Sequence, residues 1–168
     1  MATAQLRRAA EDGFMRIDLA GLLPALLPRA IAWAEALSRA ILQSGAPLTS
    51  ADLALARSVG VGNPENIRLS VVDRIPVPED AQLRLAALEA GLLAPGTLGL
   101  TLGYAVLVRR GHEARARLLA HEFRHVYQYE RAGSIAAFLP VYLREIVTHG
   151  YADAPSEIDA RAHEHDGR

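Results

Sequence analysis

The residues most clearly suited to chemistry lie in the segment His121-Glu122-Phe123-Arg124-His125, which follows the pattern H-E-x-x-H. On a helix, two residues four positions apart lie on the same face, so both imidazoles can converge on one ion. Glu122 would point about 100° round from His121, beside the metal rather than onto it. Catalytic zinc takes three protein ligands and leaves a position for water, whose proton a neighbouring carboxylate can accept. The pattern therefore predicts His121 and His125 as zinc ligands and Glu122 as the general base.

The surrounding residues predict the helix that this spacing requires. The run from about 113 to 130 contains no Gly or Pro, and its apolar side chains wrap most of the helix circumference. Such a helix should be buried, and buried histidines and a buried Glu need polar partners, which a metal would supply. The alternative is a core helix whose histidines bond to backbone carbonyls and whose Glu122 pairs with Arg124.

The third ligand must come from another part of the chain, and Glu157 is our first choice. Pro155 begins a helix, which places Glu157 in a first turn that its neighbours hold in position. Asp159 is the second choice. In the alternative interpretation, Glu157 pairs with Arg161 on the protein surface, four residues along the helix, with little energetic weight.

Together, His121-Glu122-x-x-His125 and a downstream helix with Glu157-x-Asp159-Ala160 resemble the gluzincin group of zinc metallopeptidases. The resemblance covers roughly the last seventy residues. It implies a helical zincin-like domain in which His121, His125 and Glu157 bind Zn²⁺ and Glu122 is the catalytic base.

One position departs from the pattern of this group. Several gluzincin families place an Asp four residues after the third ligand to orient the first histidine, whereas this chain has Arg161. The supporting carboxylate must then be Asp159 or Asp153, which weakens the assignment of Glu157. The residues from 125 to 133 also resemble small bacterial proteins of this type.

Other residues are candidates for supporting roles. His149 or Tyr151, between the motif helix and Glu157, would donate a hydrogen bond to the developing oxyanion. The alternative is that both are capping or turn residues. We expect His112 to be a surface residue, and His163 and His165 to lie in a solvated tail.

A strand expected at 104–108 lies immediately upstream of the motif helix. If its edge is free, an extended peptide can pair with it next to the zinc. The alternative is an interior strand with no free edge.

Two function classes stay open. The first is a zinc-dependent metalloendopeptidase that acts on a peptide or protein. The second is a catalytically inactive, zinc-stabilised binding or regulatory domain. A purely structural zinc needs no base, so Glu122 favours the enzyme.

Composition narrows the remaining classes. A length of 168 residues with 51% hydrophobic content predicts a single domain over 1–168, with a helical part at about 1–60 and a metal-site part at about 65–168. A net charge of −1 gives no electrostatic case for a nucleic-acid partner. The chain has no Cys, which excludes disulfides and thiolate ligands, and no Lys.

The amino-terminal part of the sequence makes a poor signal peptide, because acidic residues precede its apolar run and two prolines interrupt that run. We therefore expect a cytoplasmic protein. The stretch from 30 to 42 is predicted to be an amphipathic core helix, too short and too charged to span a bilayer.

The sequence predicts an α+β fold that is mostly α, with a small antiparallel or mixed sheet next to the motif helix. Helices are expected near 3–12, 22–43, 50–58, 79–91, 113–130, 134–148 and 155–165, and strands at 67–72 and 104–108.

Overall fold

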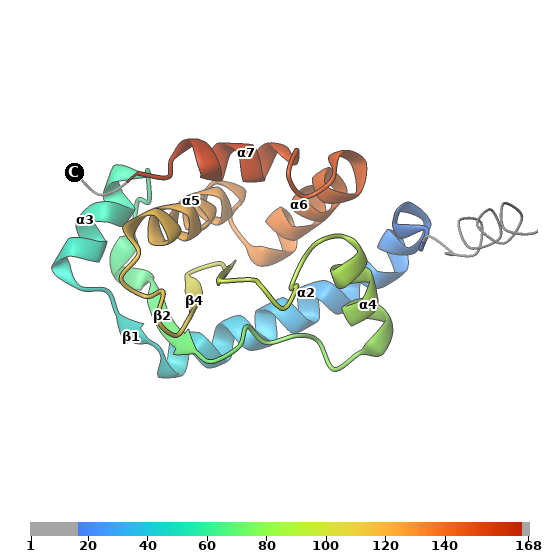
Figure 1. The fold of residues 1–168 in the computed structure, drawn as a ribbon, viewed down its shortest axis with the longest axis horizontal. Helices are drawn as coiled ribbons and strands as arrows, with labels where there is room; N and C mark the ends of the chain where they lie inside the picture. Colours follow the sequence, from blue (N-terminus) through green and yellow to red (C-terminus); the bar gives the residue numbers. More distant parts are fainter. Residues whose placement is uncertain (1–16, 166–168) are drawn as a thin grey trace, which may run out of the picture.

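The computed structural model describes residues 17–165 and confirms a mainly helical α+β fold with a small mixed sheet (Figure 1). Its helices are α2 (Leu19–Ser44), α3 (Ser50–Ser58), the short 3₁₀ helix η1 (Pro64–Asn66), α4 (Ala81–Glu89), α5 (Ala116–Ala132), α6 (Ile135–His149) and α7 (Pro155–Ala162). Its strands are β1 (Ala46–Pro47), β2 (Arg68–Val72), β3 (Gly99–Leu102) and β4 (Ala105–Arg109). The helix expected near 3–12 lies outside the described residues.

The sheet separates α2 from α5 and α3, and strand β4 shows why. Successive side chains of a strand point to opposite faces. Val106 and Val108 pack with α3 and α5, whereas Ala105 and Leu107 pack against Ile41 of α2. All four of these β4 residues are fully buried. The sheet is therefore covered on both faces, which gives a three-layer arrangement.

The order of strands is β1-β2-β4-β3, with β2 parallel to β4 and the other two pairs antiparallel. The strand expected at 104–108 is β4, and it lies in the interior of the sheet. Of the two alternatives left open for this strand, the interior position is therefore the one observed, and β4 has no free edge. The edge next to α5 belongs to β3, a short strand that is not among the strands expected at 67–72 and 104–108.

Helix α5 begins three residues later than expected. The residues before it form a turn in which the Arg115 amide donates to the carbonyl of His112. The helix ends at Gly133, which adopts the left-handed conformation with φ 93° that glycine permits without strain.

The carboxyl end of α5 is anchored to the loop after α3 through Glu130. Its carboxylate accepts hydrogen bonds from the backbone amides of Gly62 (2.7 Å) and Asn63 (2.9 Å) and from the Tyr104 hydroxyl (2.7 Å). Five α5 positions from Glu122 to Tyr129 that carry or surround the motif are buried. The motif helix is thus a core helix whose carboxyl end is fixed to the loop after α3.

Helix α2 is continuous over 26 residues and contains both Pro24 and Pro28 in its first three turns. It starts at Leu19 because Asp18 caps it, accepting a hydrogen bond from the Gly21 amide. Its buried positions repeat at helical spacing: Leu26, Ala30, Ala34, Ser38 and Ile41. The expectation of a core helix holds, although the helix is longer than the stretch from 30 to 42.

The length of α2 corrects one argument from the sequence. Among the described helices, α2 is long and apolar enough to cross a membrane by length and composition. Of its most apolar stretch of 18 residues, 17% is buried in the fold. Core helices of soluble proteins and amino-terminal signal sequences meet the same criterion.

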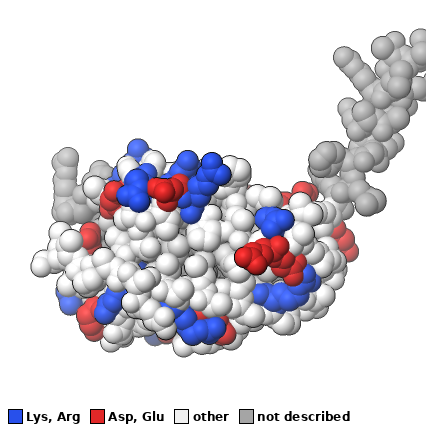
Figure 2. Space-filling view, turned by 90° about the horizontal axis from the view of Figure 1, so that it is seen from below, with Lys and Arg blue, Asp and Glu red and all other residues white. Residues whose placement is uncertain are grey.

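The surface seen in Figure 2 carries charges of both signs in small mixed groups, separated by a broad uncharged area. Among the described residues, charges of opposite sign form ion pairs such as Arg110 with Asp73 (2.7 Å). Neither sign dominates this face of the molecule.

Candidate metal centre

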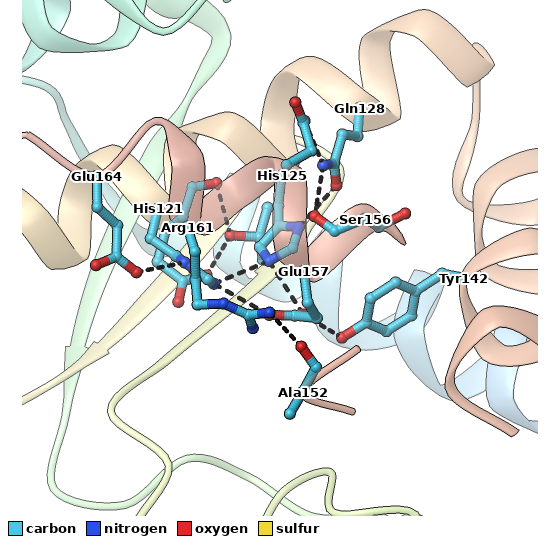
Figure 3. Close-up of polar contacts among 12 residues, drawn as sticks. His121, His125, Gln128, Tyr142, Ala152, Ser156, Glu157, Arg161 and Glu164 are labelled. Carbon is cyan, nitrogen blue, oxygen red and sulfur yellow. Dashed lines mark hydrogen bonds and ion pairs between the residues drawn. The ribbon is translucent and has the colours of Figure 1, made fainter. Parts of the chain in front are cut away.

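His121, His125 and Glu157 come together in one group, although Glu157 is 32 positions from the nearer histidine in the sequence (Figure 3). The two imidazole Nε2 atoms are 3.1 Å apart. Each lies 3.4 Å from a different oxygen of the Glu157 carboxylate. The three ligand atoms of the group lie within 4.8 Å of one another. Helix α5 supplies both histidines from one face, and the first turn of α7 supplies the carboxylate.

The outer nitrogens of both imidazoles face acceptors. His121 Nδ1 lies 3.0 Å from a carboxylate oxygen of Glu164, and His125 Nδ1 lies 2.8 Å from the amide oxygen of Gln128. The orientation of Gln128 follows from its amide nitrogen, which donates to the Ser156 carbonyl and to Asp159. Each Nδ1 is therefore the protonated nitrogen, and each Nε2 directs a lone pair into the group.

This donor set fits a metal ion. Two imidazole lone pairs and a carboxylate converge without a proton donor between them, which is unfavourable unless a cation binds there. Glu157 is 1% exposed, and its Oε2 makes no hydrogen bond in the described part of the chain. Two imidazole nitrogens and one carboxylate oxygen are ligands that zinc accepts.

The pKa shifts agree with a group that attracts positive charge. Burial alone would lower the pKa of His121, but the surrounding carboxylates, first that of Glu157, raise it above its ordinary value. Burial would raise the pKa of Glu157, yet its contacts with His121 and His125 hold that pKa well below the ordinary range. The group therefore favours a cation, either a proton on an imidazole or a metal ion.

Glu122 lies beside this group and outside it. Its carboxylate is buried and accepts a hydrogen bond of 2.6 Å from the hydroxyl of Thr101 on β3. The backbone of Gly99 packs closely against the other oxygen, since a Cβ at that position would lie 2.2 Å from Glu122 Oε1. Glu122 nevertheless lines both hollows beside the centre. Edge strand β3 thus fixes the orientation of this carboxylate.

Asp159 does not join the ligand group. Its carboxylate binds the Arg124 guanidinium through contacts of 2.8 and 3.0 Å and also accepts from Gln128 at 2.8 Å. Through Gln128 it reaches the outer nitrogen of His125. Asp159 therefore supports His125 from behind. The sequence proposed Asp159 or Asp153 to orient the first histidine, His121, but the carboxylate at its outer nitrogen is that of Glu164. Arg161 turns away to the carbonyl of Ala152.

A cavity of about 180 Å³ adjoins the three candidate ligands. Helices α2, α4 and α6 and strand β3 form its walls, mostly with apolar side chains. A more open groove of about 760 Å³ meets this cavity at His121, Glu122 and Tyr151, and the segment from Gly91 to Gly99 lies along both. The candidate centre is therefore accessible from two hollows.

The other residues considered in the sequence differ in whether they line the hollows beside the centre. Tyr151 lines both hollows, whereas His149 is exposed at the end of α6 and lines neither. His112 is only partly exposed, and its Nδ1 is buried. The expected solvated tail is wrong, because His163 lies 2.8 Å from the Asp159 carbonyl and His165 lies 3.2 Å from the Ser58 hydroxyl.

The sequence analysis did not predict several residues that contact the ligands or Glu122. Glu164 lies seven positions after Glu157, a spacing that returns to the same side of a helix, and this was the available signal. Tyr142 donates a 2.7 Å hydrogen bond to Glu157 from α6. Gly99 and Thr101 carried no signal that could be used, because their roles depend on how β3 packs against α5.

Comparisons with protein-family models, curated proteins and solved structures found no match for this chain.

Proposed function

We propose that this protein is a zinc-dependent hydrolase of peptide bonds, with His121, His125 and Glu157 as ligands and Glu122 as general base. The observation that carries the proposal is the position of Glu122: buried, oriented by Thr101 and kept out of the ligand group. A structural zinc site needs no such carboxylate. When bound in a His₂Glu set, zinc polarises a carbonyl and lowers the pKa of water.

Glu122 has the surroundings of a group that moves a proton. Its Oε2 is occupied by the Thr101 hydroxyl, so its other oxygen, Oε1, is available to take a proton from water and later pass it to the leaving amine. Thr101 also lies 3.1 Å from the backbone carbonyl of Glu122, which fixes its own side chain. The hydrogen bond therefore keeps the base in one orientation.

Tyr151 is the better of the two oxyanion-donor candidates because it lines both hollows. Burial, reinforced by the charge of Glu157, raises the pKa of the Tyr151 hydroxyl. The hydroxyl therefore keeps its proton and can donate a hydrogen bond to a developing oxyanion. His149 has no such position.

An extended substrate can pair with β3. Its inner side is bonded to β4, and among the described residues no strand lies on its outer side. The backbone of β3 passes Glu122 at Gly99. A peptide added at this edge would place its backbone next to the base.

The test compares Glu122→Gln with wild type in zinc content and in hydrolysis of a peptide library. The substitution keeps the shape and the Thr101 contact but removes the base. We expect unchanged zinc content and a loss of hydrolysis of at least about 100-fold, as for removal of a general base. Glu89→Gln, an exposed change on α4, is the matched control. Equal hydrolysis by the Glu122 variant and wild type would contradict the mechanism, and zinc binding without hydrolysis in either would favour a binding or regulatory domain.

A further inference from the structure

We infer that the cavity beside the metal centre binds a linear aliphatic chain, and that the substrate is an amide carrying such a chain on its acyl side. The choice of bond rests on the proposed function, whereas the binding of the chain does not. In the reaction, the oxygen of water bonds to the acyl carbon, the carbon–nitrogen bond breaks, and a proton is transferred to the leaving nitrogen.

The polarity of the cavity is divided between its two ends. Its polar lining includes the candidate ligands together with their neighbours Thr101 and Tyr142. Helices α2 and α4 contribute only apolar or aromatic side chains. A ligand that fills the cavity therefore needs a polar group at the metal and an apolar remainder.

The shape of the cavity favours a chain over a ring. On α2 its lining forms one stripe at helical spacing: Leu19, Leu23, Leu26, Ala30, Trp33 and Ala34. This stripe covers 15 residue steps, or about 22 Å of helix. The volume of about 180 Å³ is only slightly larger than the roughly 150 Å³ of an apolar cavity that holds one benzene. Because this small volume extends along about 22 Å of α2, the cavity must be narrow.

Small side chains on two facing helices create this space. Ala30 and Ala34 of α2 line it from one side, and Ala86 and Ala87 of α4 line it from the other. The two helices contact each other beside the cavity, and Leu26, Ala30, Ala34 and Ala86 belong to one buried cluster. Larger residues at these positions would fill the cavity.

The open groove can hold the amine component of the substrate, on the other side of the amide bond. It meets the cavity at His121 and Glu122, and its outer rim carries Arg115, Arg117 and Glu164. An acyl chain in the cavity would thus place the amide at the centre and a polar amine component in the groove.

The single Trp of the chain, Trp33, lines the cavity and reports its occupancy. We would titrate the full-length protein with 12-bromododecanoic, 2-bromododecanoic and unbrominated dodecanoic acids and record tryptophan fluorescence. We expect saturable quenching, stronger from bromine at the chain end than from bromine at carbon 2. Across unbranched acids from four to ten carbons, affinity should rise about fourfold per methylene, which corresponds to ~0.8 kcal/mol. Absence of saturable quenching, or tighter binding of phenylacetic acid than of octanoic acid, would overturn the inference.

Ala87→Phe should fill the cavity and weaken dodecanoic acid binding at least tenfold, whereas Ala32→Phe on the exposed side of α2 should not. Leu23→Gln, which makes the lining polar without adding bulk, gives a second test if Ala87→Phe does not fold. Equal affinity in a folded cavity variant and in Ala32→Phe would contradict the site.

The zinc-loaded protein should hydrolyse N-dodecanoylglycine at least about 100-fold better than N-acetylglycine in kcat/KM. Quenching at Trp33 without hydrolysis of either amide would support the cavity but overturn the acyl amide as substrate, and only the additional absence of peptide hydrolysis would contradict the proposed hydrolase. Hydrolysis of peptides without quenching or chain preference would leave the hydrolase standing and overturn the aliphatic site.

Discussion

A carboxylate oxygen of Glu164, two positions beyond the end of α7, lies 3.0 Å from Nδ1 of His121. The same carboxylate pairs with Arg117 at 2.9 Å, one turn earlier on α5. His121 is thus held between the ion that it would bind and a carboxylate behind it. Arg161 stands where several gluzincin families have the Asp that orients the first histidine. In this chain, Glu164 from the carboxy-terminal segment contacts that histidine instead.

Glu164→Ala should weaken zinc binding by about 10- to 100-fold, because loss of a partner behind a ligand histidine releases its orientation and lowers its basicity. Competition with a chromophoric chelator measures the dissociation constant. Arg117→Met is the control, since it removes the other partner of Glu164 and leaves the contact with His121. If both variants bind zinc as tightly as wild type, Glu164 does not support the ligand.

Gly99→Ala should disturb the base without removing the metal. The new Cβ would lie 2.2 Å from Glu122 Oε1, so the carboxylate must move or the strand must shift. We expect zinc content near wild type, a loss of hydrolysis, and a decrease of about 1–3 kcal/mol in the free energy of unfolding, typical of overpacking. Denaturant titration and peptide hydrolysis measure the two effects.

Gly96→Ala, in the same segment, is the matched control because a Cβ there would meet no atom within 4 Å. It should leave hydrolysis and stability near wild type. Similar activity in the two variants would show that Glu122 does not depend on its packing against β3.

The sequence predicted those parts of the centre that depend on local geometry. His121 and His125 share a face of one helix because they are four residues apart, and this holds wherever the helix packs. The start of α3 at Ser50 was predictable for the same reason, because the Thr49 hydroxyl oxygen caps it by accepting a hydrogen bond from the Asp52 amide.

The features that the sequence did not predict depend on distant segments packing together. Edge strand β3 is only four residues long and begins with Gly99, so it carries little strand pattern of its own. Its pairing with β4 and its approach to Glu122 decide where it lies. Glu164 lies between His163 and His165, which were expected in a solvated tail, and only its spacing of seven residues from Glu157 indicates that its side chain could return to α5. The cavity likewise arises only when the alanines of α2 and α4 face each other.

Glu130 should make the stability of the protein sensitive to acid. Burial would raise the pKa of Glu130, but hydrogen bonds from Gly62, Asn63 and Tyr104 lower it below the ordinary value. A lowered folded-state pKa means that the stabilisation is complete above the unfolded-state pKa and is lost as the pH falls through the folded-state value. We expect this contribution at pH 7 and its loss below about pH 4.

Glu130→Gln should lower the free energy of unfolding at pH 7 by about 1.5–3 kcal/mol at most, the range for hydrogen bonds to a charged group, because Glu130 is partly exposed. The difference from wild type should shrink as the pH falls below about 4. Denaturant unfolding at a series of pH values measures it, with Glu89→Gln as the exposed control. A difference that does not change with pH would show that the charge of Glu130 adds nothing to these contacts.

Removal of zinc should loosen α7 before the rest of the fold. Glu157 joins α7 to both histidines of α5, and its carboxylate is buried, so loss of the ion leaves an uncompensated charge in the core. An ion that binds only the folded state stabilises by RT ln(1 + [L]/Kd), about 4 kcal/mol at a thousandfold excess over Kd. We therefore expect a chelator to lower the melting temperature by several degrees.

The contacts of Asp159 with Arg124 and Gln128 do not involve the ion, so α7 should stay docked but open more often. Hydrogen exchange with and without chelator measures this. Protection of the α7 amides should fall more than that of α3, which shares no ligand. In His125→Ala, protection of α7 should no longer respond to the chelator. If α7 in the wild-type protein exchanges at the same rate with and without zinc, Glu157 is not a ligand.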